Sequence, residues 1–244
     1  MDGVISPGEY DAAAAIGGMV SWGHAATGKT VVADMQQVVW YVGYDEKYLY
    51  LSMRSPNPPG VWPLARVKTN DAGNPILYDD HVEIQIAKRR DRATFPGVGF
   101  YKIMANARGY VNDEWYYNGT PGTEGEWSIA GPCKASVTED HWDLEIAVDI
   151  RAFDETSLDG KTWVLQLLRA DSSGGVYFAG WVGSNWMGWN EFGQVTFSRR
   201  APALQFREPL ELVRGHMRLA LGVTGQAKRP VPAPRIPRHR DRGV

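Results

Sequence analysis

Short runs of alternating β-branched and aromatic residues, joined by polar turns, constrain the fold of this chain more than any other feature. Residues 38–44 and 48–53 flank the turn Asp45-Glu46-Lys47, a pattern that predicts a β-hairpin. Two more hairpins are expected at residues 100–106 with 110–115 and at residues 134–138 with 141–149, and single strands at residues 31–35, 81–86, 162–170 and 193–197. Because the connections carry no repeated helical pattern, about ten such strands predict an all-β fold, an antiparallel β-sandwich.

One expected strand, at residues 81–86, alternates strictly between apolar and polar residues. The alternation predicts one oily face made by Val82, Ile84 and Ile86, and an opposite polar face made by His81, Glu83 and Gln85. The preceding residues 55–80 contain five prolines, so we expect a long surface connection there.

The pattern changes near residue 200. We expect residues 1–200 to form the sandwich domain and residues 201–244 to form an appendage. Within the appendage, residues 207–221 have the periodicity of a short helix, and residues 228–244 are rich in Pro and Arg, which is typical of an extended linker or tail.

Charge and cysteine content argue against several classes of protein. Lys and Arg number 26 and Asp and Glu number 28, giving a net charge of −2, so nothing favours a nucleic-acid partner. The single cysteine, Cys133, cannot form an intrachain disulfide or a cysteine-based metal cluster. No apolar run approaches the roughly 18 residues of a membrane span. The first residues lack the charged and apolar segments of a signal peptide, and we expect the chain to be a fragment or a processed form.

Three tryptophans fall within nine residues at Trp181, Trp186 and Trp189, among glycines, Asn and Ser. Glycine and polar neighbours are typical of a surface loop, so these indoles are expected at least partly in water. An exposed indole forgoes a burial gain of roughly 1.5–3 kcal/mol, and a cluster of them usually has a partner that covers it. Sugar rings, whose C–H faces lie flat on aromatic rings, are the partner that this composition suggests first.

Two motifs associated with chemistry fit structural roles better. Residues 23–30 match the phosphate-binding pattern G-x-x-x-x-G-K-[ST], but glycines break the segment before it and no βαβ series follows, which favours a surface loop. Asp143 and Glu145 lie two residues apart on one expected strand, near the carboxylate separation of a retaining glycosidase. Such enzymes draw the pair from different strands, so the spacing favours an exposed face of an edge hairpin.

Five segments resemble, in order, the family 9 carbohydrate-binding modules and their relatives. These segments are residues 2–10, 38–53, 79–86, 142–148 and 192–197, and the likeness covers about residues 2–198. The resemblance implies a CBM9-like or DOMON-like β-sandwich that binds sugars and does no chemistry, typically as a module appended to a secreted glycan-active enzyme.

The resemblance also implies two aromatic side chains that clamp a terminal sugar ring, with polar residues bonding its hydroxyls. Tyr78 stands just before the motif Asp80-His-Val-Glu83, where Trp is usual, and the second aromatic is expected at Trp186 or Trp189. Glu83 matches the family's polar partner, and strand direction adds three amide side chains. The predicted ligand-binding residues are Tyr78, Glu83, Gln85, Asn106, Trp186, Trp189 and Asn190.

The expected partners are mono-, oligo- or polysaccharides and neighbouring domains of a parent protein, outside the cell or at its surface. No cofactor is required, although the resemblance implies a structural calcium, for which Asp2 and Glu9 are candidates. Three alternatives stay open: a structural module whose aromatic loops pack on a neighbouring domain, a haem-binding sandwich, and an enzyme. The haem alternative would draw its axial ligands from residues such as His81, Met104 and Met187.

Overall fold

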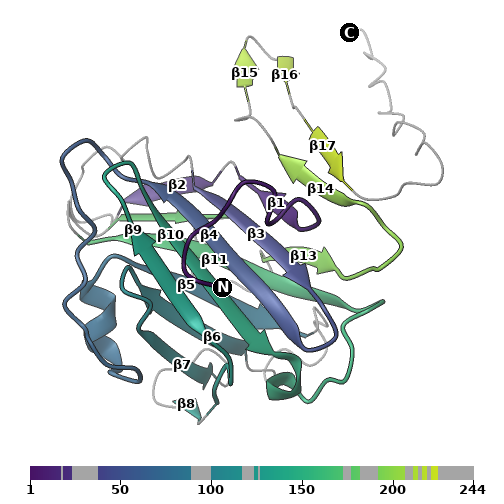
Figure 1. Ribbon diagram of the computed structural model, residues 1–244, viewed down its shortest axis with the longest axis horizontal. Coiled ribbons are helices and arrows are strands. Elements are labelled where there is room, and N and C mark those ends of the chain that lie inside the picture. Colours follow the sequence, from purple (N-terminus) through teal and green to yellow (C-terminus); the bar gives the residue numbers. More distant parts are fainter. Residues whose placement is uncertain are drawn as a thin grey trace, which may run out of the picture.

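The computed structural model describes residues 1–17, 19–23, 38–88, 100–116, 124–125, 127–172, 177–181, 192–206, 211–213, 216–218 and 221–224. They form two large β-sheets stacked face to face (Figure 1) and a separate two-stranded sheet made by residues 211–213 and 216–218. All pairings between neighbouring strands are antiparallel except the one between β1 and β14. The sequence prediction of an antiparallel β-sandwich is therefore confirmed.

The first sheet, called sheet A, has the strand order β17-β14-β1-β3-β4-β10-β9. Its strands are β1 (Ala14–Ile16), β3 (Val39–Tyr44), β4 (Tyr48–Pro56), β9 (Cys133–Val137), β10 (His141–Asp149), β14 (Ala203–Phe206) and β17 (Leu221–Thr224). The expected hairpins around residues 45–47 and 139–140 are both present, as β3–β4 and β9–β10.

The second sheet, called sheet B, has the order β2-β12-β11-β5-β6-β7-β8, and β13 also pairs with β11. Its strands are β2 (Val20–Gly23), β5 (His81–Ala87), β6 (Phe100–Asn106), β7 (Val111–Tyr116), β8 (Glu124–Gly125), β11 (Thr162–Asp171), β12 (Tyr177–Gly180) and β13 (Gly193–Thr196). The expected hairpin at residues 100–115 is β6–β7. The expected strand at residues 31–35 lies outside the described residues.

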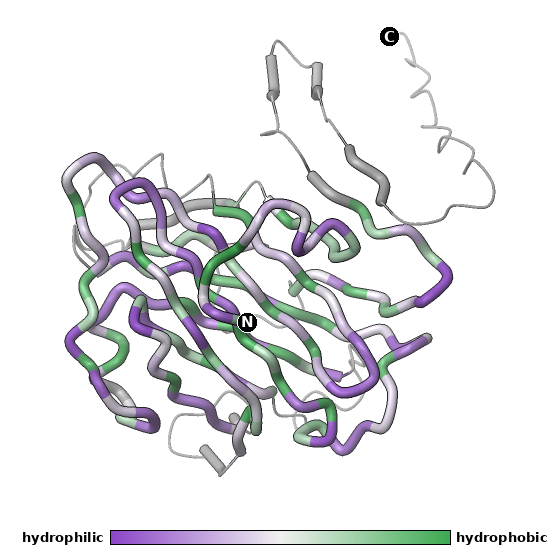
Figure 2. Tube along the Cα trace, in the orientation of Figure 1, coloured by the Kyte–Doolittle hydropathy of each residue, from purple (hydrophilic) through white to green (hydrophobic). Residues whose placement is uncertain are grey.

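The hydrophobic core lies between the two sheets, and every second residue of the central strands contributes its side chain to it (Figure 2). Trp40, Trp142 and Trp163, each in a strand of alternating pattern, are all buried. Trp163 meets Phe153 and Phe197 edge to face, with ring centroids 5.0 and 5.5 Å apart. Phe153 belongs to the short 3₁₀ helix η4 (Ile150–Phe153), which follows β10.

The prediction of a C-terminal helix at residues 207–221 is wrong. The described parts of this region are strands: β15 (Glu211–Val213) pairs with β16 (His216–Arg218) in a separate two-stranded sheet, and β17 begins at Leu221. Pairing between β15 and β16 outweighs the weak helical preference of such a short segment. Just before this region, Ala15 of β1 and Gln205 of β14 are register partners in sheet A, so this sheet continues beyond residue 200.

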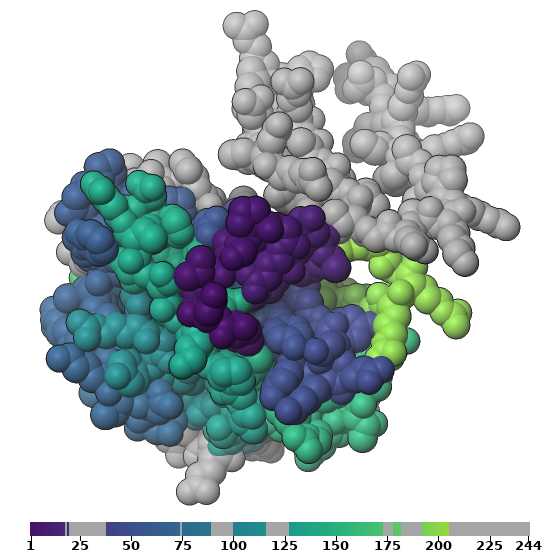
Figure 3. Space-filling view, viewed as in Figure 1, coloured from purple at the N-terminus to yellow at the C-terminus, as the bar shows by residue number. Residues whose placement is uncertain are grey.

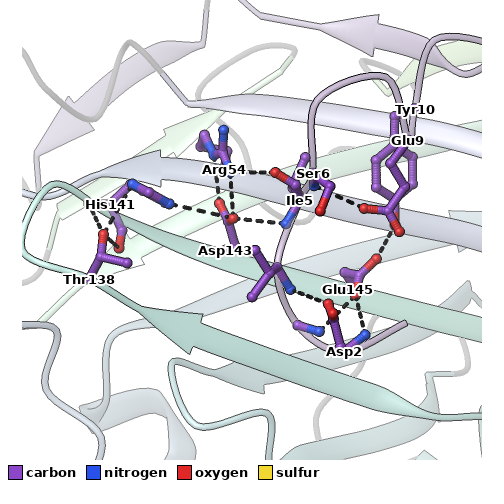
Figure 4. Close-up of polar contacts among 12 residues, drawn as sticks. Asp2, Ile5, Ser6, Glu9, Tyr10, Arg54, Thr138, His141, Asp143 and Glu145 are labelled. Carbon is purple, nitrogen blue, oxygen red and sulfur yellow. Dashed lines mark hydrogen bonds and ion pairs between the residues drawn. The ribbon is translucent and has the colours of Figure 1, made fainter.

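The N-terminal segment crosses the outer face of sheet A (Figure 3) and is held by two buried carboxylates of β10 (Figure 4). Glu145 accepts hydrogen bonds from the backbone N–H groups of Asp2 and Gly3, at 2.9 and 2.8 Å, and from the Tyr10 hydroxyl. Burial and the bond to Glu145 raise the pKa of that hydroxyl, which therefore keeps its proton and donates it.

Asp143 accepts from the Ile5 N–H at 2.9 Å and forms a two-pronged ion pair with the guanidinium of Arg54. The expectation that Asp143 and Glu145 lie on an exposed face of an edge hairpin is therefore wrong. β10 lies inside sheet A between β4 and β9, and both carboxylates are buried: Glu145 is engaged by the N-terminal segment, and Asp143 by that segment and by Arg54.

Two glycines of this segment provide a matched test of the packing. Gly3 and Gly8 both have positive φ, but a Cβ on Gly3 would lie 2.8 Å from the Ala135 backbone, whereas Gly8 has no atom closer than 3.8 Å. We expect Gly8→Ala to cost about 1 kcal/mol through its φ alone. Gly3→Ala should cost about 2 kcal/mol more, because the segment must lift away from β9. Urea unfolding of both variants measures the difference, and equal costs would contradict the contact.

Candidate functional site

The polar residues of β5 lie on the outer face of sheet B, facing away from the core. β5 is central in the sheet, between β11 and β6. Glu83 is opposite Leu168 of β11 and Met104 of β6, and Gln85 is opposite Gln166 and Lys102. The predicted alternation of β5 is confirmed, but His81, Glu83 and Gln85 are as buried as the core residues between them.

A charged row crosses this face. The Nζ atom of Lys102 lies 3.7 Å from Glu83 Oε2 and 3.7 Å from Glu114 Oε1, while the other Glu83 oxygen faces His81 Nε2 at 3.4 Å. Burial alone would raise the pKa of the Glu83 carboxyl, but the charge of Lys102 and the hydrogen bond from His81 more than offset it, so that pKa is lowered. Glu83 is therefore a carboxylate near neutral pH, and a carboxylate accepts hydrogen bonds strongly.

Two buried side chains on this face, Glu83 and Gln85, have polar atoms without hydrogen bonds to other described residues. Within the described part of the chain, Glu83 Oε2 and both amide atoms of Gln85 have no hydrogen-bond partner, although Gln85 is completely buried. An unpaired buried polar group costs about 1–3 kcal/mol, so such groups in a folded protein usually meet water or a ligand. A ligand rich in hydroxyl groups could satisfy all three atoms, because a hydroxyl both donates and accepts.

An apolar cluster adjoins the polar row. Ala87, Phe100, Val164 and Phe192 form a buried cluster separate from the main core. Phe100 is a register neighbour of Tyr116 on β7, and its ring meets that of Phe192 edge to face at 6.5 Å. The outer face of sheet B thus combines hydrogen-bonding groups with aromatic and aliphatic surface, which is the usual composition of a small-molecule site.

The segment that carries the predicted second aromatic begins and ends beside this face. Trp186, Trp189 and Asn190 lie outside the described residues, but Trp181 donates its backbone N–H to the Leu167 carbonyl, and Gly193 pairs with Leu165. The Trp181 ring covers Gly193 so closely that a Cβ there would lie 2.4 Å away. The described residues Trp181 and Gly193 are therefore both held on β11, the strand that pairs with β5 at Gln85.

Tyr78 is exposed, as its predicted role requires. It ends the 3₁₀ helix η2 (Asn74–Tyr78) and is 67% exposed. The two residues that follow, Asp79 and Asp80, are completely buried. Asp79 accepts from the N–H groups of Arg66 and Val67, and Asp80 accepts from those of Leu64 and Ser172. The chain that follows Tyr78 is therefore fixed to residues 64–67 and to Ser172.

Asn106, the remaining predicted residue, has its hydrogen bonds filled by the protein itself. Its Nδ2 donates to the Val67 carbonyl and to Asp79, and its Oδ1 accepts from the N–H groups of Arg108 and Tyr110. All four hydrogen-bonding positions of the amide are occupied. The described geometry therefore gives Asn106 the task of holding a connection and a turn.

The donors proposed for haem and calcium are also engaged in the described structure. His81 directs Nδ1 to the Asp79 carbonyl and Nε2 to Glu83, and Met187 lies outside the described residues. Asp2 accepts from the Val4 N–H and Glu9 from the Ser6 N–H. No group of three or more His, Cys, Asp or Glu residues suited to a metal is found among the described residues. Calcium and haem stay predictions.

A cavity of about 400 Å³ opens elsewhere, between β7 of sheet B and β9 of sheet A. Asn70, Asp71, Asp113, Ser128 and Cys133 are among its lining residues. Asp113 is opposite Ile103, a core residue, so its side chain lies on the core side of sheet B, away from Glu83. None of the described residues that line it is aromatic, so they offer no stacking surface for a sugar.

Sequence reasoning missed three residues of the polar row: Lys102, Glu114 and Gln166. Each is polar at an alternate position of its expected strand, which was the available signal. What the sequence lacks is the register that places Lys102 beside Gln85 and Glu114 beside Lys102. Without that register, these three residues could not be told from solvent-facing ones.

No protein-family model matches the sequence, and no relative is found among curated proteins. Solved structures do share its architecture. A family 9 carbohydrate-binding module from Caldicellulosiruptor kristjanssonii in complex with glucose is 14% identical, with a TM-score of 0.55 over 82% of this chain and 92% of that one. Its complex with cellotriose matches with the same identity and TM-score, over 82% and 90%.

A proposed carbohydrate-binding protein from Bacteroides uniformis is 15% identical, with a TM-score of 0.53 over 66% of this chain and 78% of that one. At these identities the similarity establishes the fold, and the chain has the β-sandwich of the family 9 modules. Among the described residues, no helix is long and apolar enough to cross a membrane.

Proposed function

We propose that this chain is a non-catalytic sugar-binding module whose ligand contacts the outer face of sheet B at Glu83 and Gln85. The observation that carries the proposal is the set of buried polar atoms without hydrogen bonds at this point of the sheet. The fold supports it, because structures with the same architecture have been solved with glucose and with cellotriose. The charged row is compatible with a neutral ligand, because the charge of Lys102 is already balanced by the carboxylates of Glu83 and Glu114.

In this proposal sugar hydroxyls donate to Glu83 Oε2 and exchange hydrogen bonds with the Gln85 amide. Aromatic rings cover the C–H face of the sugar, and Tyr78 with Trp186 or Trp189 are the rings that we assign to this task. Asn190 joins them as a hydrogen-bonding residue from the same segment as Trp189. The module would serve a larger glycan-active or cell-surface protein outside the cell, by binding its substrate rather than by catalysis.

Isothermal titration with glucose, cellobiose and cellotriose tests the proposal. We expect a Kd of about 1 µM or weaker, because one stacked ring and a few hydrogen bonds against water give at most about −8 kcal/mol. Glu83→Gln keeps the shape and removes the charge, and Gln85→Ala removes the amide. Each should weaken binding by about tenfold or more, as expected for losing a hydrogen bond to or beside a charged group.

Glu46→Gln is the matched control, because Glu46 lies on the β3–β4 turn and its side chain is 85% exposed. It should bind like the wild type. The proposal fails if the wild type binds no sugar, or if Glu83→Gln and Gln85→Ala fold normally and bind as tightly as Glu46→Gln.

A further inference from the structure

The connection between β4 and β5, residues 57–80, gathers exposed apolar side chains. Across the described residues, six large hydrophobic side chains are exposed: Met1, Val4, Val61, Trp62, Tyr78 and Leu204. Three of the six lie on this connection, with exposed fractions of 40% for Val61, 60% for Trp62 and 67% for Tyr78. Trp62 therefore leaves most of an indole in water, which is costly unless a partner covers it.

This connection is fixed to both sheets. At its start, Asn57 donates its N–H to the Asp140 carbonyl and its side-chain amide to the Thr138 carbonyl, at the β9–β10 turn of sheet A. Further along, Leu64 and Asp80 bond in both directions: the Asp80 N–H donates to the Leu64 carbonyl at 2.6 Å, and the Leu64 N–H donates to the Asp80 carboxylate.

Trp62 itself is flanked by residues that restrict the backbone. Pro58, Pro59 and Pro63 have fixed φ angles, and the Val61 N–H closes a turn onto the Pro58 carbonyl at 2.9 Å. A ring on a backbone that is already ordered loses little entropy when a ligand covers it. The buried carboxylates of Asp79 and Asp80 thus hold in place a connection whose largest exposed side chains are Trp62 and Tyr78.

Trp62 and Tyr78 are also close enough to contact one oligosaccharide. Trp62 is two residues from Leu64, and Tyr78 is two residues from Asp80. Two residues span at most about 7 Å, and hydrogen-bonded backbones lie about 5 Å apart, so the two Cα atoms are at most about 20 Å apart. A sugar chain of a few residues covers such a distance.

We propose that Trp62 forms an additional aromatic subsite that recognises sugar residues beyond the first, so that the ligand of this module is an oligosaccharide or a polysaccharide chain. The inference rests on the proposed function, because it extends the same ligand from Tyr78 along the connection. It assigns Trp62 a role that depends on chain length, unlike that of Glu83, which every ligand would contact.

Affinity measured along a ladder of glucose, cellobiose, cellotriose and cellotetraose tests this subsite. Trp62→Ala should weaken binding of the tri- and tetrasaccharide by about tenfold or more, the effect of losing one stacked ring, and change glucose binding by less than twofold. Val61→Ala, at the neighbouring exposed position, and Leu204→Ala, on β14, are the controls and should leave the whole ladder unchanged. A Trp62 indole N–H resonance that shifts with cellotriose and not with glucose would give a second, independent readout.

The outcomes separate the two proposals. If the wild type binds the ladder and Glu83→Gln abolishes binding while Trp62→Ala changes nothing at any length, the subsite is overturned and the proposed function stands. If Trp62→Ala weakens glucose as much as cellotriose, Trp62 belongs to the first site and the extended subsite is again overturned. If the wild type binds no sugar of any length, both proposals fall together.

Discussion

Replacing Glu145 with alanine is expected to lower the free energy of unfolding by about 3–5 kcal/mol. The change leaves three donors on the N-terminal segment without their acceptor: the N–H groups of Asp2 and Gly3 and the hydroxyl of Tyr10. Because Glu145 is completely buried on β10, water reaches the vacated position only if the segment lifts from sheet A. Guanidinium unfolding measures the loss, and limited proteolysis should cleave within the first 12 residues of the variant.

Glu9→Ala is the matched control for Glu145→Ala, because Glu9 lies on the same segment, is exposed, and accepts one hydrogen bond within the described structure, from the Ser6 N–H. It should cost about 1 kcal/mol or less. If Glu145→Ala costs no more than Glu9→Ala, the buried carboxylate does not hold the N-terminal segment, and the account of sheet A given above is wrong.

The second large effect is expected at Asp80, where Asp80→Ala should cost about 3–5 kcal/mol. The carboxylate accepts from the N–H groups of Leu64 and Ser172 and faces the Arg169 guanidinium at 3.4 Å. Arg169 is buried over the face of Trp142, with its guanidinium carbon 4.6 Å from the ring centroid, so it cannot turn to water when Asp80 is removed. Asp171 remains near it and limits the loss.

Chemical denaturation measures the stability of Asp80→Ala, and hydrogen exchange locates the change. The amides of Leu64 and Ser172 should exchange faster, because both lose their acceptor, and the connection bearing Trp62 and Tyr78 should loosen. Asp80→Asn keeps one acceptor oxygen and should lose less stability. Unchanged protection at Leu64 in Asp80→Ala would show that the connection is held by other contacts.

Local alternation predicted most strands of this fold, because a strand with one buried face alternates apolar and polar residues along its own sequence. The β3–β4 hairpin is an example: its polar turn and its apolar face are contiguous in the sequence. The residues that hold the N-terminal segment could not be predicted in this way. Glu145 and Gly3 are 142 residues apart, and a strand's polar face looks the same whether water or another segment covers it.

The candidate site was predictable in part for the same reason. Glu83 and Gln85 stand out because they alternate with core residues of one strand, and the family resemblance singled out Glu83. Lys102 reaches Glu83 through the pairing of β5 with β6, which the sequence does not specify. The prediction of a C-terminal helix was wrong for a related reason, since the pairing of β15 with β16 decides the structure there. The roles of Trp186, Trp189 and Asn190 stay predictions.

The central claim is that a sugar binds the outer face of sheet B at Gln85, and the side-chain amide resonances of Gln85 test it most directly. Titrating ¹⁵N-labelled protein with cellotriose should shift the Gln85 amide pair saturably, because the ligand supplies the hydrogen bonds that this buried group lacks. The Asn106 amide, whose hydrogen bonds are filled by the protein, should stay in place. Saturable binding that leaves the Gln85 amide unmoved would contradict the account.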